Sequence, residues 1–226
     1  AKDGTGTHST QADQMPTGFD TVARGPDDLA GQLYTSGTTG RSKGAMMSHK
    51  NLLSNAQSLT TFWQISNKDR LIHALPIFHT HGLFVAMNTS LLAGAQVRFM
   101  DGFDIDKITT EIPQSPLMMG VPPFYTRLLD AARLPRDLVA NMRLFISGSA
   151  PLLAETHTAF ETRTGHRILE RYGMTETNMI TSNPYDGERL AGTVGYALPG
   201  TEVIITDNGK PVDAGQIGMI EVRGAN

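Results

Sequence analysis

The sequence of 226 residues contains no cysteine, which excludes disulfide frameworks and metal sites built on cysteine. It also lacks an excess of one charge, since 19 basic residues stand against 22 acidic ones. This balance argues against a nucleic-acid surface and against polybasic attachment to a membrane. No apolar run approaches the roughly 18–20 residues of a membrane span, and the N-terminal stretch has no signal-peptide core. We therefore expect a soluble, cytoplasmic protein.

The two ends of the sequence lack the features of a finished chain. It begins without an initiator methionine, and it stops directly after the strand-like residues 219–223. We therefore expect a piece of a longer protein, although 226 residues are enough to bury a substantial core.

Strand-like and helix-like patterns alternate between residues 29 and 190. Short apolar runs at 71–75, 117–121 and 144–146 predict buried strands, and longer periodic segments such as 152–164 predict helices. Alternation at this spacing predicts an α/β fold with a doubly wound, mostly parallel sheet. Residues 1–28 have no period and are expected to form a connecting segment or a frayed end. Residues 191–226 predict the start of a β-rich subdomain, with a turn at residues 207–209.

The stretch from Tyr34 to Gly44 has the composition of a phosphate-binding loop. Its glycines allow backbone N–H groups to approach an anion, its hydroxyls add neutral donors, and Lys43 adds a positive charge. The common pattern G-x-x-x-x-G-K-[ST] does not fit, so we expect a phosphate loop of another kind. The alternative is a flexible surface loop. The predicted phosphate-binding residues are Thr35, Ser36, Gly37, Thr38, Thr39, Gly40 and Lys43.

A second polar segment, residues 170–176, follows a predicted strand. Tyr172 can stack on a base, Gly173 permits close backbone approach, and Thr175 can donate a hydrogen bond to a phosphate oxygen. Glu176 can hold Mg²⁺, for which oxygen ligands are preferred. The alternative is a polar loop with an incidental acid.

Two further segments lie where a predicted strand ends and a helix begins, the side of an open α/β sheet where ligands bind. Residues 76–82 include His79 and His81, whose i, i+2 spacing is also compatible with metal ligation, though no carboxylate or third histidine is nearby. Residues 147–151 can form a tight turn with proline in the first helical turn. They do not match the G-x-S-x-G nucleophile elbow, which disfavours a serine hydrolase.

Together these segments resemble the adenylate-forming superfamily of acyl-CoA synthetases, luciferases and adenylation domains. Residues 34–44 match its pattern [YF]-T-S-G-[ST]-T-G-x-P-K-G, with Ser42 in place of proline, and residues 172–176 match Y-G-x-T-E. Residues 76–82 and 147–151 match P-x-F-H-x-x-G and G-[SA]-A-P, and 218–224 weakly match G-E-[IL]-x-x-R-G. The resemblance covers nearly everything from about residue 28, and it is nearest to the malonyl-CoA synthetases.

The resemblance implies ATP, Mg²⁺ and CoA as reaction partners and assigns roles by position. Gly148, Ser149 and Ala150 would lie against the adenine, with Glu170, Arg171, Tyr172, Gly173 and Thr175 also on the nucleotide. His79 and Ser149 would face the acyl group, and Glu176 would hold Mg²⁺. Lys43, Thr175 and Glu176 would be the catalytic residues.

Arg127 takes the family position of the arginine that grips the second carboxylate of the substrate. On a helical wheel it lies at the edge of an apolar arc, where an arginine can also simply snorkel to solvent. We therefore expect an ATP-dependent carboxylate:CoA ligase acting on malonate or a near relative. Two alternatives remain: an adenylation domain that loads a carrier protein, and a nucleotide-binding piece without turnover. The family's ribose-binding aspartate and mobile C-terminal domain would lie beyond residue 226, and its N-terminal part is missing.

Overall fold

A seven-stranded sheet forms the centre of the protein in the computed structural model, which describes residues 6–35, 41–131 and 134–226. The strand order is β4-β3-β5-β6-β7-β8-β9, and the pairs from β4 to β7 are parallel whereas β8 and β9 are antiparallel. This arrangement confirms the predicted α/β class with a mostly parallel sheet. The strands are β3 Arg70–His73, β4 Gln96–Phe99, β5 Leu117–Gly120, β6 Leu144–Ser147, β7 Leu169–Met174, β8 Asn178–Ser182 and β9 Tyr196–Ala197.

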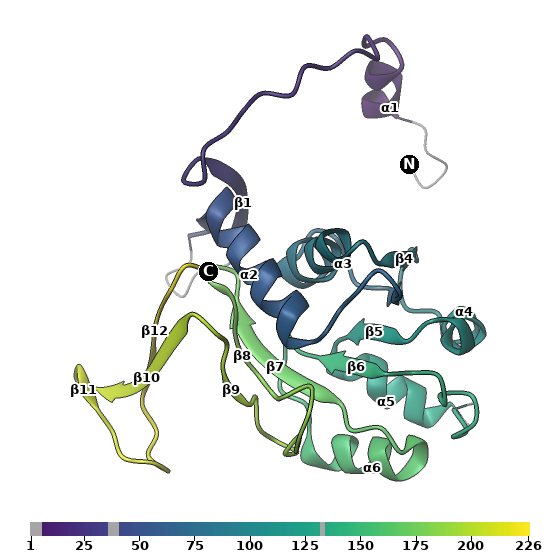
Figure 1. Ribbon diagram of the computed structural model, residues 1–226, viewed down its shortest axis with the longest axis vertical. Helices are drawn as coiled ribbons and strands as arrows, with labels where there is room; N and C mark the ends of the chain where they lie inside the picture. The colour runs from purple at the N-terminus through teal and green to yellow at the C-terminus, as the bar shows by residue number, and fades with distance from the viewer. Residues whose placement is uncertain (1–5, 36–40, 132–133) are drawn as a thin grey trace.

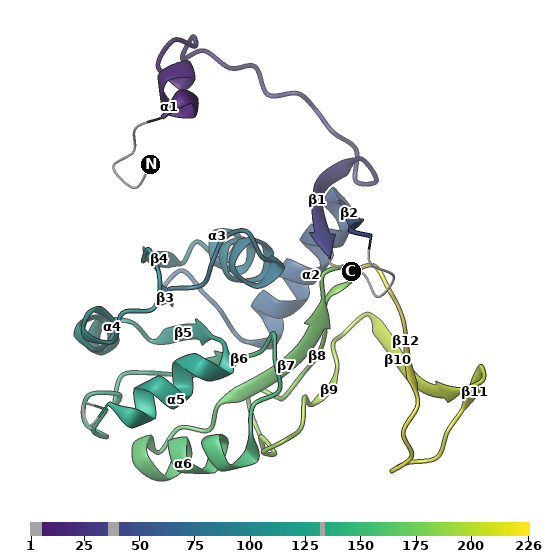
Figure 2. The same ribbon diagram turned by 180° about the vertical axis from the view of Figure 1, so that it is seen from behind.

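Helices cover both faces of this sheet, with α2 and α3 on one face and α5 and α6 on the other (Figures 1 and 2). Successive residues of a strand point to opposite faces, so Leu117 and Met119 of β5 join one core cluster and Met118 joins the other. Strands buried on both faces read as continuous apolar runs. The helices are α1 Thr7–Ala12, α2 His49–Phe62, the π-helix η1 His81–Met87, α3 Asn88–Ala93, α4 Ile105–Glu111, the 3₁₀-helix η2 Ile112–Gln114, α5 Pro122–Asp130 and α6 Ala154–Thr164.

A β-hairpin precedes the sheet. Strands β1 (Leu29–Thr35) and β2 (Lys43–Ser48) pair antiparallel, with Thr35 opposite Lys43. The hairpin therefore brings together the two ends of the predicted phosphate loop, while Ser36–Gly40 lie outside the described residues. Helix α2 starts directly after β2, because Ser48 caps it: the Asn51 N–H donates to Ser48 Oγ at 3.2 Å, and the Ser48 N–H donates to Asn51 Oδ1 at 2.8 Å.

The C-terminal residues form a separate three-stranded sheet of order β11-β10-β12. Its strands are β10 Thr201–Asp207, β11 Lys210–Pro211 and β12 Met219–Gly224. Asn208 and Gly209 both have positive φ, 50° and 75°, which suits the two-residue turn between β10 and β11. Because β9 still pairs with β8, this sheet begins at Thr201, ten residues after the expected boundary near 191.

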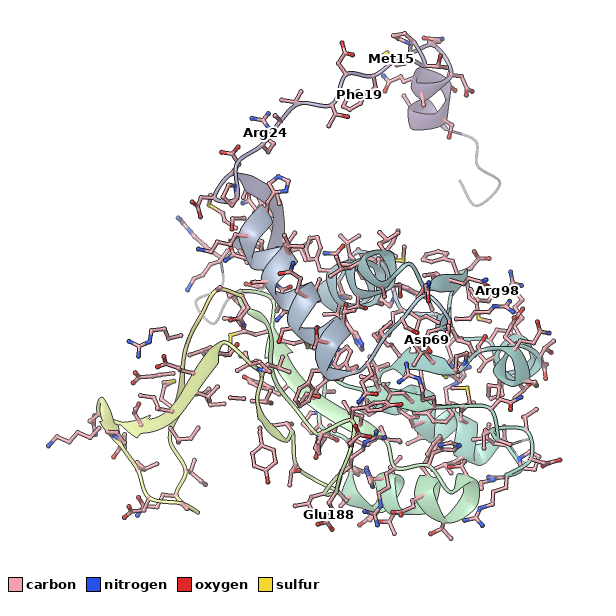
Figure 3. The ribbon with its side chains drawn as sticks, viewed as in Figure 1. Met15, Phe19, Arg24, Asp69, Arg98 and Glu188 are labelled. Atoms are coloured by element: carbon pink, nitrogen blue, oxygen red, sulfur yellow. The ribbon has the colours of Figure 1, made fainter. Side chains whose placement is uncertain are left out.

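The segment from α1 to β1 runs away from the rest of the chain (Figures 1 and 2). Figure 3 shows Met15, Phe19 and Arg24 along it, and the Phe19 side chain is 84% exposed. None of its described side chains belongs to either core cluster. Within the described ranges, no helix has the length and apolar character needed to cross a bilayer.

Candidate functional site

Two cavities lie at the carboxyl ends of the parallel strands, where open α/β sheets bind ligands. We call the first, of about 320 Å³, the histidine cavity, and the second, of about 340 Å³, the tyrosine cavity. They share Ser149, Arg171 and Gly173, so they are two compartments of one site. The histidine cavity is lined by Leu75, Pro76, His79, Thr80, His81, Gly82, Val121, Ser149, Arg171, Gly173, Met174, Thr175 and Met179. The tyrosine cavity is lined by Ser149, Ala150, Pro151, Leu152, Glu170, Arg171, Tyr172, Gly173, Gly192 and Val194.

Arg171, on β7, is the only arginine or lysine among the described residues that line either cavity, and it is 2% exposed. Its Nε and Nη2 atoms have no hydrogen-bond partner within the described part of the chain. Burial lowers the pKa of the guanidinium to about 9, so it keeps its charge at neutral pH. A buried unpaired charge is costly, and a guanidinium is matched best by a carboxylate or phosphate. Arg171 therefore indicates an anionic ligand.

Gly148, at the end of β6, makes room for this guanidinium. A Cβ atom added at Gly148 would overlap the Cζ, Nε and Nη1 atoms of Arg171. Any larger residue would push the arginine out of its position. The predicted role of Gly148 against the adenine stays a prediction, and the structure adds its contact with Arg171.

Glu170 precedes Arg171 and lines only the tyrosine cavity. It is 5% exposed, and its Oε2 atom has no partner in the described ranges. Desolvation raises the pKa of its carboxyl to about 7, against the opposing effect of a hydrogen bond from the Leu152 backbone. The carboxyl is therefore close to half-protonated at neutral pH.

His81, the first residue of η1, faces Ser149 across the histidine cavity. Its Nδ1 atom lies 3.2 Å from Ser149 Oγ, and its Nε2 atom is buried without a partner among the residues described. Burial, together with the charge of Arg171, lowers its pKa well below the usual value. The imidazole is therefore neutral.

The structure brings most of the predicted site residues together. His79, Ser149, Arg171, Gly173 and Thr175 line the histidine cavity, and Ser149, Ala150, Glu170, Arg171, Tyr172 and Gly173 line the tyrosine cavity. Thr35 and Lys43 pair at the hairpin, and the Lys43 side chain is exposed. Their chemical roles stay predictions.

Five of the predicted residues that the structure describes are not among those that line either cavity: Thr35, Lys43, Arg127, Gly148 and Glu176. Arg127 is exposed on α5, and its guanidinium lies over the ring of Phe103, 4.2 Å from the centroid. The role predicted for it on the substrate carboxylate stays a prediction, and Arg171 is the arginine that lines the cavities. Glu176 is exposed in the turn between β7 and β8.

Within the described part of the chain, Glu176 has no cluster of carboxylates and histidines around it of the kind that forms a dedicated metal site. Among the described residues, no group of three or more histidines, aspartates or glutamates is arranged to hold a metal. Mg²⁺ commonly needs only one or two carboxylates because nucleotide phosphates supply other ligands. A single exposed carboxylate beside the cavities fits that mode of binding.

Sequence reasoning did not name His81, Thr80, Val121 or Met174, which also line the histidine cavity. His81 was visible in the sequence only as half of a weak metal-ligand pair. Its contact with Ser149 joins residues 68 positions apart, which no local spacing reveals. The π-helix that begins at His81 gives no clear sequence signal either, although such helices occur frequently at functional sites.

A mostly parallel sheet with two joined cavities at the carboxyl ends of its strands has the arrangement of a ligand-binding α/β protein. The sequence pattern of the AMP-binding enzymes matches residues 2–226, and the chain belongs to that family. It is thus a member of the adenylate-forming superfamily, as its motifs indicated.

Several relatives are malonate–CoA ligases. The chain is 36% identical over 225 residues to the malonate–CoA ligase of Arabidopsis thaliana, which covers 91% of this chain and 37% of the relative. It is 38% identical over 193 residues to the mitochondrial malonate–CoA ligase of Mus musculus, covering 78% of this chain and 33% of that one. The ATP-bound structure of MatB from Rhodopseudomonas palustris matches 99% of this chain and 45% of its own, with a TM-score of 0.94 and 57% identity. The chain therefore spans less than half the length of these proteins.

Proposed function

We propose that the full-length protein containing this chain is an ATP-dependent malonate:CoA ligase. In the first half-reaction a carboxylate oxygen of malonate attacks the α-phosphorus of ATP, and the bond to pyrophosphate breaks. In the second, the CoA sulfur attacks the acyl carbon, and AMP leaves as the thiol proton is lost. The kinship with malonate–CoA ligases supports this class of reaction.

The observation that carries the choice of a dicarboxylate is the unpaired guanidinium of Arg171 in the histidine cavity. Malonate has two carboxylates and activates only one. The other needs a partner, because an unpaired anion in a cavity with Leu75, Val121 and Met179 in its wall would be strongly disfavoured. Arg171 supplies the fork of donors that matches it. We therefore assign the retained carboxylate to Arg171.

The two compartments suit the two halves of an acyl-adenylate. Tyr172 offers a stacking surface for the base in the tyrosine cavity. Ser149 and Gly173 belong to both cavities, so the reacting carboxylate and the α-phosphate would meet beside them. The carboxylate is ionised at neutral pH, so this step needs positioning rather than a general base.

We assign the neutralisation of charge on the phosphates to residues of the β1–β2 hairpin and of the β7–β8 turn. Lys43 and the residues before it would hold the phosphates, and Thr175 would donate to a phosphate oxygen. Glu176 would hold Mg²⁺, which neutralises charge on the leaving pyrophosphate when it is bound. Each of these roles is a proposal that rests on position and residue type.

ATP–pyrophosphate exchange on the full-length protein tests this proposal. We expect malonate to support exchange with a higher kcat/KM than acetate, butyrate or succinate, because these lack either the second carboxylate or the right length. A thiol-trapping step with CoA should then yield malonyl-CoA. Butyrate preferred over malonate would overturn the dicarboxylate assignment, and thioester formation only on a carrier protein would overturn the CoA ligase.

A further inference from the structure

Strand β12 ends at Gly224, the last residue of a motif for which the proposed reaction has so far no use. The chain then turns back against α2, because the Ala225 carbonyl accepts hydrogen bonds from Asn51 Nδ2 at 3.0 Å and from Ser54 Oγ at 2.9 Å. Both donors belong to the first two turns of α2. The C mark in Figures 1 and 2 lies at this junction, beside α2 and the start of β8.

The side chain of Asn226 donates to the turn between β7 and β8. Its Nδ2 atom lies 2.7 Å from the carbonyl oxygen of Thr177 and 3.1 Å from that of Met179. Its Oδ1 atom accepts from Thr201 Oγ1 at 3.3 Å. Carbonyl oxygens only accept hydrogen bonds, so the amide nitrogen must face the turn. The amide of Asn226 therefore joins the C-terminal sheet to the β7–β8 turn.

A second amide, that of Asn55 on α2, also holds this turn. Its Nδ2 donates to the carbonyl of Met179 at 2.8 Å, and the Met179 N–H donates to its Oδ1 at 3.2 Å. The bond within the turn is longer, with the Thr177 N–H 3.4 Å from the carbonyl of Met174. The turn is therefore held from outside by two amide side chains, Asn55 and Asn226, as well as by the strands that it joins.

Gly224 makes room for the Asn226 side chain. A Cβ atom added at Gly224 would overlap Asn226 Oδ1 and would lie 3.2 Å from the carbonyl oxygen of Gly200. Gly224 is not among the glycines with positive φ, so its backbone conformation does not require a glycine. The space taken by the amide is the physical reason for glycine at the last position of the motif.

The turn carries two of the residues to which the proposed reaction assigns a role. Thr175 lines the histidine cavity, and Glu176 is exposed beside it. Groups that bind a metal and phosphates must be held within about 0.5 Å of the productive position. Helix α2 directly follows β2, which begins at Lys43. Through Asn55, the turn and the hairpin are therefore attached to one helix.

We propose that Asn226 is a positioning residue that fixes the β7–β8 turn, so that Thr175 and Glu176 meet the nucleotide phosphates and Mg²⁺ in a fixed position. The inference rests on the proposed function, which gives the turn those two roles. Asn226 acts through the turn and binds neither substrate nor metal itself. Outer partners of this kind orient metal ligands, and their loss costs about 10- to 100-fold in metal affinity or activity.

Asn226→Asp in the full-length protein tests the donor. The carboxylate keeps the shape of the side chain and the acceptor for Thr201, but it repels the two carbonyl oxygens of the turn. We expect kcat for pyrophosphate exchange to fall about 10- to 100-fold, and the Mg²⁺ concentration for half-maximal exchange to rise about 3- to 10-fold. The KM for malonate should stay within about twofold, because Arg171 lies earlier on β7.

Hydrogen–deuterium exchange of the ligand-free full-length protein gives a readout that needs no activity. Peptides covering residues 174–179 should exchange about 3- to 10-fold faster in Asn226→Asp, because the turn opens more often without its donor. A peptide covering β3 should exchange at the wild-type rate, since it lies outside the turn. Thermal unfolding checks that the variant is folded.

Two further variants separate the amide from its surroundings. Gly224→Ala leaves Asn226 in the sequence but displaces its side chain, so kcat should fall about 3- to 10-fold, and adding this change to Asn226→Asp should cost little more. Ser54→Ala is the matched control. It removes a hydrogen bond to the Ala225 carbonyl without touching the amide, and kcat should stay within about twofold of the wild type.

A purely structural asparagine would give another result. A lower kcat with unchanged Mg²⁺ dependence and unchanged exchange in the turn overturns the proposal, and so do wild-type kinetics in Asn226→Asp. Fully additive losses in the double variant contradict the link between Gly224 and Asn226. If the wild type supports no carboxylate-dependent exchange of pyrophosphate, the proposed function has failed, and this role of Asn226 falls with it. The two failures are therefore distinguishable.

Discussion

Glu170 and Arg171 are neighbours on β7 that differ in charge and in the cavities they line. Glu170 lines only the tyrosine cavity, whereas Arg171 also reaches the histidine cavity. Alternation along the strand turns successive side chains to opposite faces. Both are buried and keep unpartnered polar atoms in the described chain, Oε2 of the acid and two guanidinium nitrogens of the base.

The different charges of Glu170 and Arg171 allow the end of one strand to contribute to the binding of two kinds of ligand. Burial makes the carboxyl of Glu170 easier to protonate, with a pKa of about 7, while Arg171 stays charged. The tyrosine cavity is therefore lined by a carboxyl that is about half-protonated at neutral pH, together with Arg171. The histidine cavity is lined by Arg171 without this carboxyl, which suits a carboxylate ligand. Changing each residue tests each half of this account.

The largest effect is expected from Arg171→Leu in the full-length protein. It removes the partner of the retained carboxylate, which should cost about 2–5 kcal/mol with malonate, a factor of about 30 to several thousand in kcat/KM. Butyrate never makes this contact and should lose little. Pyrophosphate exchange with both substrates measures the difference. Arg171→Lys serves as the matched control and should rescue only in part, because a lysine lacks the planar fork.

The second prediction concerns how the ionisation of Glu170 makes the free energy of unfolding depend on pH. The pKa of its carboxyl is about 7 in the folded chain, against an ordinary value of 4.5, so between these values the folded state holds a proton that the unfolded state has lost. The contribution of this carboxyl to the free energy of unfolding is therefore fully present below about pH 4.5. It falls as the pH rises and is lost above about pH 7, a change of about 3 kcal/mol.

Glu170→Gln removes this titration while keeping the shape of the side chain. The difference in unfolding free energy between variant and wild type should shift in favour of the variant as pH rises from about 4.5 to 7, and then level off. Urea unfolding at several pH values measures it, and titrations common to both proteins cancel. A difference that does not change with pH would show that Glu170 has an ordinary pKa.

The smallest effect is expected from Arg127→Leu. Arg127 is exposed and lies over the ring of Phe103, away from the lining of both cavities. Loss of that cation–π contact should cost about 0.5–1 kcal/mol of stability. The malonate-to-butyrate ratio should stay within about threefold of the wild type. A collapse of this ratio would restore the role that the sequence assigned to Arg127.

The contrast between Arg127 and Arg171 shows how far the sequence alone reaches. Apolar runs and strand–helix alternation predicted the doubly wound sheet, because burial on both faces imposes those patterns directly. The sequence motifs predicted eight of the twenty residues that line the two cavities. Neither the pairing of β2 with β1 nor the antiparallel strand β8 was predicted, since both depend on register with distant partners.

The sequence placed Arg171 on the nucleotide, and its position in the wall of the histidine cavity was beyond sequence reasoning for a similar reason. Arg171 reaches it because Gly148, 23 positions earlier, leaves space for the guanidinium, and His81 meets Ser149 across 68 positions. The spacing of residues along the sequence does not predict contacts between residues so far apart. Family position gave Arg127 a plausible role, and the structure supplied the competing candidate.

A crystal structure of the full-length protein with malonate and AMP bound tests the central claim most directly. We expect one carboxylate of malonate within about 2.7–3.2 Å of the Arg171 guanidinium and AMP in the tyrosine cavity. A malonate whose carboxylates both lie away from Arg171, or one held by Arg127, would contradict the account.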